Sequence, residues 1–88
     1  MAVDDTGCVD CATVLEVLRF HKVWIGPDPD YPGQTVLAKG DKIDSRVMPE
    51  WVDRDILQFF KRTFGIPITH FYHPEWLHKR AENKRIEP

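Results

Sequence analysis

Residues 49–65, Pro-Glu-Trp-Val-Asp-Arg-Asp-Ile-Leu-Gln-Phe-Phe-Lys-Arg-Thr-Phe-Gly, predict one amphipathic helix around which the rest of the chain is organised. Proline is tolerated at a first helical position, and acidic side chains near it suit the positive end of the helix dipole. Gly65 can adopt the left-handed conformation that ends a helix, and Pro67 prevents continuation. The predicted buried face comprises Val52, Ile56, Phe59, Phe60 and Thr63, with Leu57 and Phe64 beside them.

The composition indicates one globular domain. The 88 residues are 42% hydrophobic and 30% charged, with ten aromatic side chains, which is too apolar for a disordered chain. We expect the domain to span residues 1–88, with loose ends at 1–7 and 83–88. No apolar run approaches the roughly 20 residues that cross a bilayer, and the N-terminus lacks a signal-peptide pattern. We therefore expect a cytoplasmic protein that has no membrane partner.

The first half of the chain alternates between helical and extended patterns. A helix capped by Asp10 is predicted to run to about Phe20, followed by a strand over 21–25. Three prolines and two glycines make 26–33 a stiff loop. Two further strands are predicted over 34–38 and 42–48, joined by a tight turn.

The chain after Gly65 predicts a short edge strand over 66–72 and a last helix that opens at 73–77. The fold class is therefore α+β, in the order α-β-β-β-α-β-α, with a small, mainly antiparallel sheet of three or four strands and two helices on one face. The predicted core comprises Val14, Leu15, Leu18, Val23, Ile25, Val36, Ile43, Val47, Ile56, Phe59 and Phe60.

One hexapeptide pattern occurs twice, as Pro-Glu-Trp-Val-Asp-Arg at 49–54 and Pro-Glu-Trp-Leu-His-Lys at 74–79. Both copies fit an ordinary entry from a strand into a helix. The alternative is a duplicated surface in which Trp51 and Trp76 form one binding patch.

Two groups of residues are of the types that metal binding, redox chemistry or acid–base catalysis requires. Cys8 and Cys11 form a C-x-x-C pair, but no predicted strand precedes it as a thioredoxin-like motif would require, and a zinc site would need His70 and His73 to converge. We expect neither a metal nor another cofactor. His70, His73 and His78 could supply acid–base groups, yet no nucleophile motif accompanies them. We therefore predict no catalytic residues and no enzyme, with a histidine-dependent RNA-cleaving activity as a distant alternative.

The predicted sheet offers a candidate binding surface. Alternation groups His21, Val23 and Ile25 against Lys22 and Trp24, and Ile43, Ser45 and Val47 against the charged residues of the third strand. We expect Lys22, Trp24, Lys42, Asp44 and Arg46 to share the solvent face. A tryptophan among basic side chains resembles a platform for nucleic acid, although an ordinary solvated face fits as well.

The order helix, three strands, helix is similar to the double-stranded-RNA-binding-like fold of HicA-type toxins. The segment 55–66 resembles the second helix of that family. The family's glycine-serine-histidine segment on the first hairpin has no counterpart, because His-Lys-Val-Trp-Ile-Gly-Pro stands there at 21–27. The resemblance therefore implies a topology and transfers no catalytic residue.

We predict a non-enzymatic binding module that recognises a protein partner, or a second copy of itself, through exposed aromatic residues and the C-terminal strand and helix. The alternative function is binding of RNA or DNA through the basic, tryptophan-bearing sheet face and the basic C-terminal end. Residues 1–60 contain eleven acids and six bases, whereas 61–88 contain three acids and six bases. The candidate binding residues are Trp24, Lys22, Lys42, Arg46, His70, Tyr72, His73 and Trp76.

Overall fold

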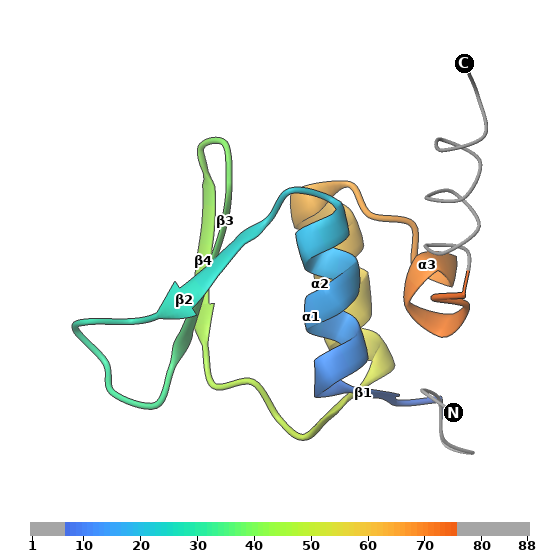
Figure 1. Ribbon diagram of the computed structural model, residues 1–88, viewed down its shortest axis with the longest axis horizontal. Helices are drawn as coiled ribbons and strands as arrows, with labels where there is room; N and C mark the ends of the chain where they lie inside the picture. Colours follow the sequence, from blue (N-terminus) through green and yellow to red (C-terminus); the bar gives the residue numbers. More distant parts are fainter. Residues whose placement is uncertain (1–6, 76–88) are drawn as a thin grey trace.

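The computed structural model describes residues 7–75 and has an α+β fold (Figure 1). The predicted fold class is confirmed. Strands β2, β3 and β4 form an antiparallel sheet in that order, and β1 pairs with β5 in a second, two-stranded sheet. The elements are β1 (Val9–Asp10), α1 (Cys11–Phe20), β2 (Trp24–Pro27), β3 (Thr35–Lys39), β4 (Lys42–Arg46), β5 (Trp51–Val52), α2 (Arg54–Phe64) and α3 (Thr69–Tyr72).

The elements form layers. Figure 1 shows the three-stranded sheet on one side, α1 and α2 side by side in the middle, and α3 on the far side of the helix pair. The β1–β5 ladder, which the sequence did not predict, joins the starts of the two long helices. Val9 pairs with Val52, and the backbone N–H of Cys11 donates to the carbonyl of Glu50 at 2.9 Å.

Helix α1 begins and ends as the local sequence directs. The Asp10 carboxylate caps it by accepting hydrogen bonds from the backbone N–H and the hydroxyl of Thr13, as predicted. At the other end the N–H of Lys22 donates to the Arg19 carbonyl and the N–H of Val23 to that of Leu18. This is a Schellman arrangement, in which Lys22 occupies the left-handed position at φ 68° that glycine usually takes.

Helix α2 is shorter than predicted at its start. The pairing of β5 keeps Trp51 and Val52 extended, so Pro49 does not open the helix and Asp53 caps it instead, accepting from the N–H of Ile56 at 3.0 Å. The predicted end is confirmed, because Gly65 is left-handed at φ 73° and donates to the Lys61 carbonyl. Glycine adopts this conformation without the steric cost that a Cβ brings.

The predicted fourth strand over 66–72 is wrong. Its second half is α3, with local bonds from the N–H of His70 to the Pro67 carbonyl and from the N–H of His73 to the Thr69 carbonyl. Ile66 and Phe71 are both fully buried. Residues five apart on a strand point to opposite faces, so a regular strand over 66–72 could not bury both on one side. Beyond Glu75 the predicted last helix lies outside the described residues.

The core lies between the sheet and α3, around the two long helices. Its buried members are Val9, Val14, Val17, Leu18, Val23, Leu37, Val52, Leu57, Phe60, Phe64, Ile66 and Phe71. Of the predicted core, Val14, Leu18, Val23 and Phe60 are buried, while Leu15, Ile25, Ile56 and Phe59 are partly buried against them. Val36 is only half-buried. The prediction of Ile43 and Val47 as core residues is wrong, since they are 71% and 65% exposed.

Candidate functional site

The face of the three-stranded sheet that points away from the helices, the outer face, is largely apolar. Strand register places Trp24 beside Ala38 and Ala38 beside Ile43, and in the next row it aligns Gly26, Val36 and Ser45. Trp24 is 59% exposed, and Ile43 is more exposed still. Val47 directly follows β4, where continued alternation puts it on the same face. Large apolar side chains gathered on one exposed face commonly mark a binding surface.

The indole of Trp24 lies over Gly26 on the outer face. Trp24 and Gly26 are two residues apart on β2 and so share a face, and a Cβ atom built on Gly26 would collide with the six-membered ring of the indole. The missing side chain of Gly26 therefore makes room for the ring. This spacing, tryptophan followed two residues later by glycine on an exposed strand, is the sequence signal that could have located the site.

Lys42, Asp44 and Arg46 occupy the row of the opposite, inner face, which corrects the predicted shared surface of Lys22, Trp24, Lys42, Asp44 and Arg46. The Nε of Arg46 donates to the Asp44 carboxylate at 2.6 Å, and the two side chains are only 26% and 17% exposed. The guanidinium also lies 4.4 Å from the ring centroid of Phe59 on α2. Arg46 therefore joins the sheet to a helix, and it lies on the other face from Trp24.

The physical reason for this placement is the register of the β3–β4 hairpin. Leu37 pairs with Asp44. Because Leu37 is completely buried against the helices, Asp44 and, two residues on, Arg46 must share that inner face. Val23 and Ile25 lie on the inner face as predicted, whereas Ile43 and Val47 lie on the outer one. The ion pair with Asp44 and the contact with the Phe59 ring offset the cost of partly burying the charged guanidinium of Arg46.

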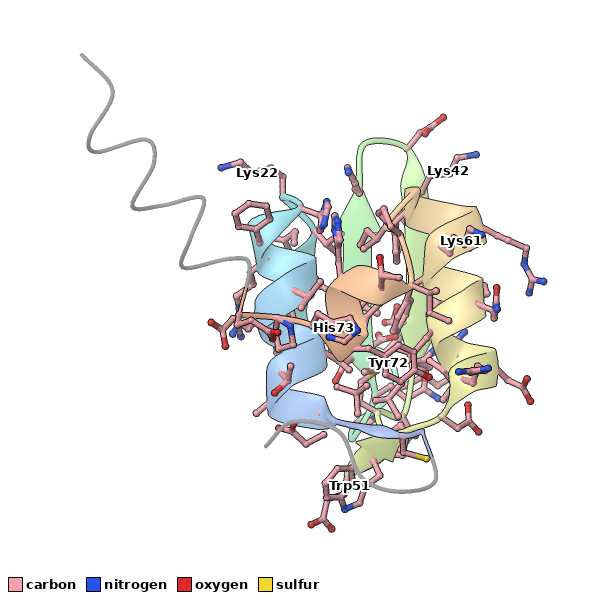
Figure 2. The ribbon with its side chains drawn as sticks, turned by 90° about the vertical axis from the view of Figure 1, so that its right-hand side faces the viewer. Lys22, Lys42, Trp51, Lys61, Tyr72 and His73 are labelled. Carbon is pink, nitrogen blue, oxygen red and sulfur yellow. The ribbon has the colours of Figure 1, made fainter. Side chains whose placement is uncertain are left out.

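The two ends of the sheet carry opposite charge. Lys22, which precedes β2, lies at the same end as the β3–β4 turn, where Lys39 and Lys42 pair directly across the two strands. Figure 2 shows Lys22 and Lys42 at that end, with Trp51 at the other end of the molecule. We call Lys22, Lys39 and Lys42 the basic end; Asp41 in the turn offsets one of its three charges.

The other end of the sheet is the loop over residues 28–34, here called the acidic loop. Asp28 accepts hydrogen bonds from the Ser45 hydroxyl at 2.5 Å and from the backbone N–H of Asp30 at 2.8 Å. These bonds, that from Ser45 first, lower the pKa of the Asp28 carboxyl. Asp30 and Tyr31 are exposed, and Figure 1 shows the loop extending from β2 away from the helices.

A second group of predicted residues lies on the far side of the molecule, around α3. Figure 2 shows Tyr72 and His73 there, so the structure does not bring them together with Trp24. The Tyr72 hydroxyl lies 3.4 Å from the Nε of Arg54, which donates to it. His73 lies 3.9 Å from Glu75, and both side chains are about 70% exposed. The predicted binding residue Trp76 lies outside the described residues.

His21 and His70, 49 residues apart, meet at the junction of α1 and α3, a pairing that sequence reasoning missed. The Nε2 of His21 lies 3.0 Å from the Nδ1 of His70, and the two rings are 5.2 Å apart with planes 20° from parallel. One nitrogen must donate and the other accept, so the tautomers of the two rings are coupled. The pair connects α3 to the end of α1. The adjacent Phe71 packs against Phe60, with their ring centroids 5.9 Å apart.

The cysteines and histidines of residues 7–75 do not assemble into a ligand group. Within residues 7–75 the structure contains no cluster of three or more histidine, cysteine or acidic side chains that could hold a metal ion. Burial, together with the neighbouring Asp10 carboxylate, raises the pKa of the Cys11 thiol. A raised pKa disfavours the thiolate, which is the reactive form in redox chemistry.

The repeated hexapeptide has different structural settings in the part that is described. Trp51 belongs to β5, pairs with Asp10 and is 43% exposed. Glu50, before it, accepts the bond from Cys11. The first copy is therefore a strand followed by a helix cap, and its tryptophan lies apart from the Trp24 face.

Comparisons with protein-family models, with curated proteins and with solved structures give no match to this chain. None of the helices described between residues 7 and 75 is both long and apolar enough to cross a bilayer.

Proposed function

We propose that this protein is a non-enzymatic protein-binding module and that the outer face of its three-stranded sheet is the contact surface. The observation that carries the proposal is the exposed indole of Trp24, which lies over Gly26. Trp24 shares its row of the sheet with Ile43. Tryptophan is the side chain most enriched among the residues that dominate protein interfaces, because it buries a large area at a low cost in conformational entropy.

The placement of charge supports a protein partner over the alternative, a nucleic acid. A nucleic-acid platform needs positive side chains beside the stacking ring. Here Arg46 lies on the inner face and is paired with Asp44, while the acidic loop lies at one end of the outer face. The loss of the predicted strand over 66–72 also removes the route in which an edge strand carrying His70 and Tyr72 extends a sheet in a partner.

Site-specific photo-cross-linking in living cells tests the proposal. A photo-reactive phenylalanine derivative replaces Ile43 or Val47 on the outer face, and Glu16, exposed on α1, serves as the control position. We expect protein adducts of defined mass from the two outer-face positions, which the change Trp24→Ala abolishes, and none from position 16.

Two outcomes would overturn the proposal. One is the absence of protein adducts at both outer-face positions. The other is adducts with RNA or DNA at those positions, together with oligonucleotide binding that weakens as salt rises and requires Trp24, which would establish the nucleic-acid function instead.

A further inference from the structure

We propose that the basic end, Lys22, Lys39 and Lys42, is a second contact surface that binds the phosphate backbone of a nucleic acid without reading its bases. The outer face takes no part in this contact, so the inference goes beyond the proposed function and does not depend on it. Two observations carry it: where the charges of the molecule lie, and what it costs the fold to place these three lysines there.

Positive charge gathers at the end of the molecule where α1, α2 and the β3–β4 hairpin all end. Figure 1 shows the hairpin turn at the same end as the C-terminal ends of the two helices, and Figure 2 shows Lys22, Lys42 and Lys61 there, with Trp51 at the other end. Six of the eight basic residues between positions 7 and 75 lie in these segments or directly after them: Arg19, Lys22, Lys39, Lys42, Lys61 and Arg62. All six are exposed except Lys39, which is partly exposed.

Most of the negative charge lies elsewhere. The acidic loop is at the opposite end of the sheet, and Asp10 and Asp53 cap the two helices at their N-terminal ends. Asp44, in the inner row, is held by Arg46. Asp41 in the hairpin turn is the acid of the basic end. A molecule with its charges divided in this way attracts a polyanion at one end and repels it at the other.

Helix ends account for half of the six basic residues. Arg19, Lys61 and Arg62 lie in the last turns of α1 and α2, where positive side chains complement the helix dipole. They would be expected there in a protein that binds no anion. The case for a binding surface therefore depends on the three lysines of the basic end.

Lys22 has an unfavourable backbone conformation. It follows α1 with a φ of 68° and is the only non-glycine residue between positions 7 and 75 with a positive φ. A Cβ atom is strained in this conformation, which glycine usually takes at the end of a helix. The hydrogen bond to the Arg19 carbonyl comes from the backbone N–H, which glycine would also supply. The fold has no need of a lysine here, and a strained residue of this kind indicates a role outside folding.

Lys39 and Lys42 have an unfavourable neighbour, which is each other. They form the last pair of the β3–β4 ladder before the turn, in the inner-face row beyond Leu37 and Asp44. Within residues 7–75 no ion pair with a carboxylate holds either lysine. Like charges directly opposite each other destabilise a hairpin, whereas a lysine opposite a glutamate stabilises it. The basic end thus contains two arrangements that cost stability, and local rules are broken in this way mainly at functional sites.

The surroundings of the lysines favour a nucleic acid over an acidic protein segment or a lipid surface. Protein partners and membranes are held through large apolar side chains beside the charges. The nearest exposed ones on these strands, Trp24 and Ile43, are on the outer face. Lysines alone bind by releasing counterions from their ligand, and a nucleic-acid backbone has the charge density that condenses such counterions. Contacts of this kind position the backbone and carry no sequence information.

Fluorescence anisotropy of labelled oligonucleotides measures the binding, with a duplex of about 20 base pairs and a single strand of about 20 nucleotides, each in two unrelated sequences. Between about 20 mM and about 200 mM salt, we expect the association constant to fall with a log–log slope of about −2 to −3, as about three phosphate contacts give. The two sequences should bind with affinities within about two-fold of each other, because only phosphates are contacted.

Two variants separate binding from folding. Lys22→Gly removes the backbone strain and Lys42→Glu removes the repulsion, so both should unfold at a temperature no lower than that of the original chain. Each should nevertheless weaken oligonucleotide binding by at least about three-fold at low salt and make the salt slope shallower by about one. Arg54→Gln, which removes one exposed charge at the start of α2, is the control matched to Lys22→Gly and should change the affinity by less than about two-fold.

Trp24→Ala separates the basic end from the outer face and should leave oligonucleotide binding unchanged. The inference fails if Trp24→Ala abolishes the binding, or if Arg54→Gln weakens it as much as Lys22→Gly does. It fails also if no oligonucleotide binds at the lowest salt, or if poly-glutamate or vesicles containing phosphatidylserine bind as tightly as the oligonucleotides. None of these results alone changes the proposed function, which cross-linking from positions 43 and 47 tests.

Discussion

The inner and outer faces of the three-stranded sheet are built from the same short strands, yet the charged pair lies on the face that packs against the helices and large apolar side chains lie on the face toward solvent. The inner face, against the helices, holds Leu37 together with the charged pair Asp44 and Arg46. The outer face, against solvent, holds Trp24 and Ile43. On a small sheet, the strand register decides which residues face the helices and become buried. The apolar residues of the other face stay exposed and are available for binding.

The largest expected effect tests the assignment of the two faces. Leu37→Ala should lower the free energy of unfolding by about 2–4 kcal/mol, because it opens a cavity between the sheet and the helices. Ile43→Ala should change it by less than about 0.5 kcal/mol, because its side chain is exposed. Urea unfolding at low protein concentration, where association is negligible, measures both. Equal losses from the two variants would show that the faces are misassigned.

The next effect concerns the ion pair of the inner face. Asp44→Ala leaves the partly buried guanidinium of Arg46 without its carboxylate and should cost about 1–2 kcal/mol of unfolding free energy. Replacing both residues, as Asp44→Leu with Arg46→Leu, should cost less than Asp44→Ala alone, because no unpaired charge is left at the contact with Phe59. Chemical denaturation of the original chain, Asp44→Ala and the double variant gives the comparison, and Asp44→Leu and Arg46→Leu complete a double-mutant cycle. An additive cycle would contradict the coupling of the two residues.

A smaller effect is expected on the outer face. Gly26→Ala places a methyl group under the indole, so the ring of Trp24 must swing away from the sheet. We expect a change in unfolding free energy below about 1 kcal/mol, because a rotating exposed side chain relieves the clash. In a background with Trp51→Phe and Trp76→Phe, the fluorescence of Trp24 should become more accessible to acrylamide. Unchanged quenching would show that the ring does not rest on Gly26.

The smallest effect is the pH dependence of the acidic loop. The folded-state pKa of Asp28 lies below its ordinary value of 3.8. The unfolded chain therefore binds more protons between those two values, so the stability contributed by Asp28 is fully present above about pH 4 and is lost as pH falls through the folded pKa. The difference in urea midpoint between the original chain and Asp28→Asn should shrink as pH is lowered from 7 to about 2.5. A constant difference would exclude the carboxylate as its cause.

Local signals in the sequence predicted much of the helical framework. Asp10 and Gly65 have the predicted capping roles, because a cap is decided by a few adjacent residues. The tight turn between β3 and β4 was also predicted. By contrast, the start of α2 depends on the pairing of Trp51 and Val52 with β1, a contact between residues more than 40 apart in the chain.

The sequence predicted one residue of the candidate site, Trp24, but not which residues share its face. Trp24 was named as a surface residue and is exposed. Its predicted neighbour Arg46 lies on the other face, and Ile43, which lies in the same row as Trp24, was assigned to the core. Alternation along a strand separates two groups of residues, but it does not say which group of one strand lies beside which group of the next.

Residues close together in the chain are enough to predict the class of the fold, the caps of the two long helices and the alternation within each strand. Contacts between distant segments decide which face of the sheet is buried, the helical form of residues 69–72 and the meeting of His21 with His70. Local patterns could not predict these features because burial is shared among distant segments. Phe71 gains more from burial among the helices than its segment would gain from local strand preference, and the burial of Leu37 decides which face of β3 turns inward. The polar and apolar residues around them take the positions that remain.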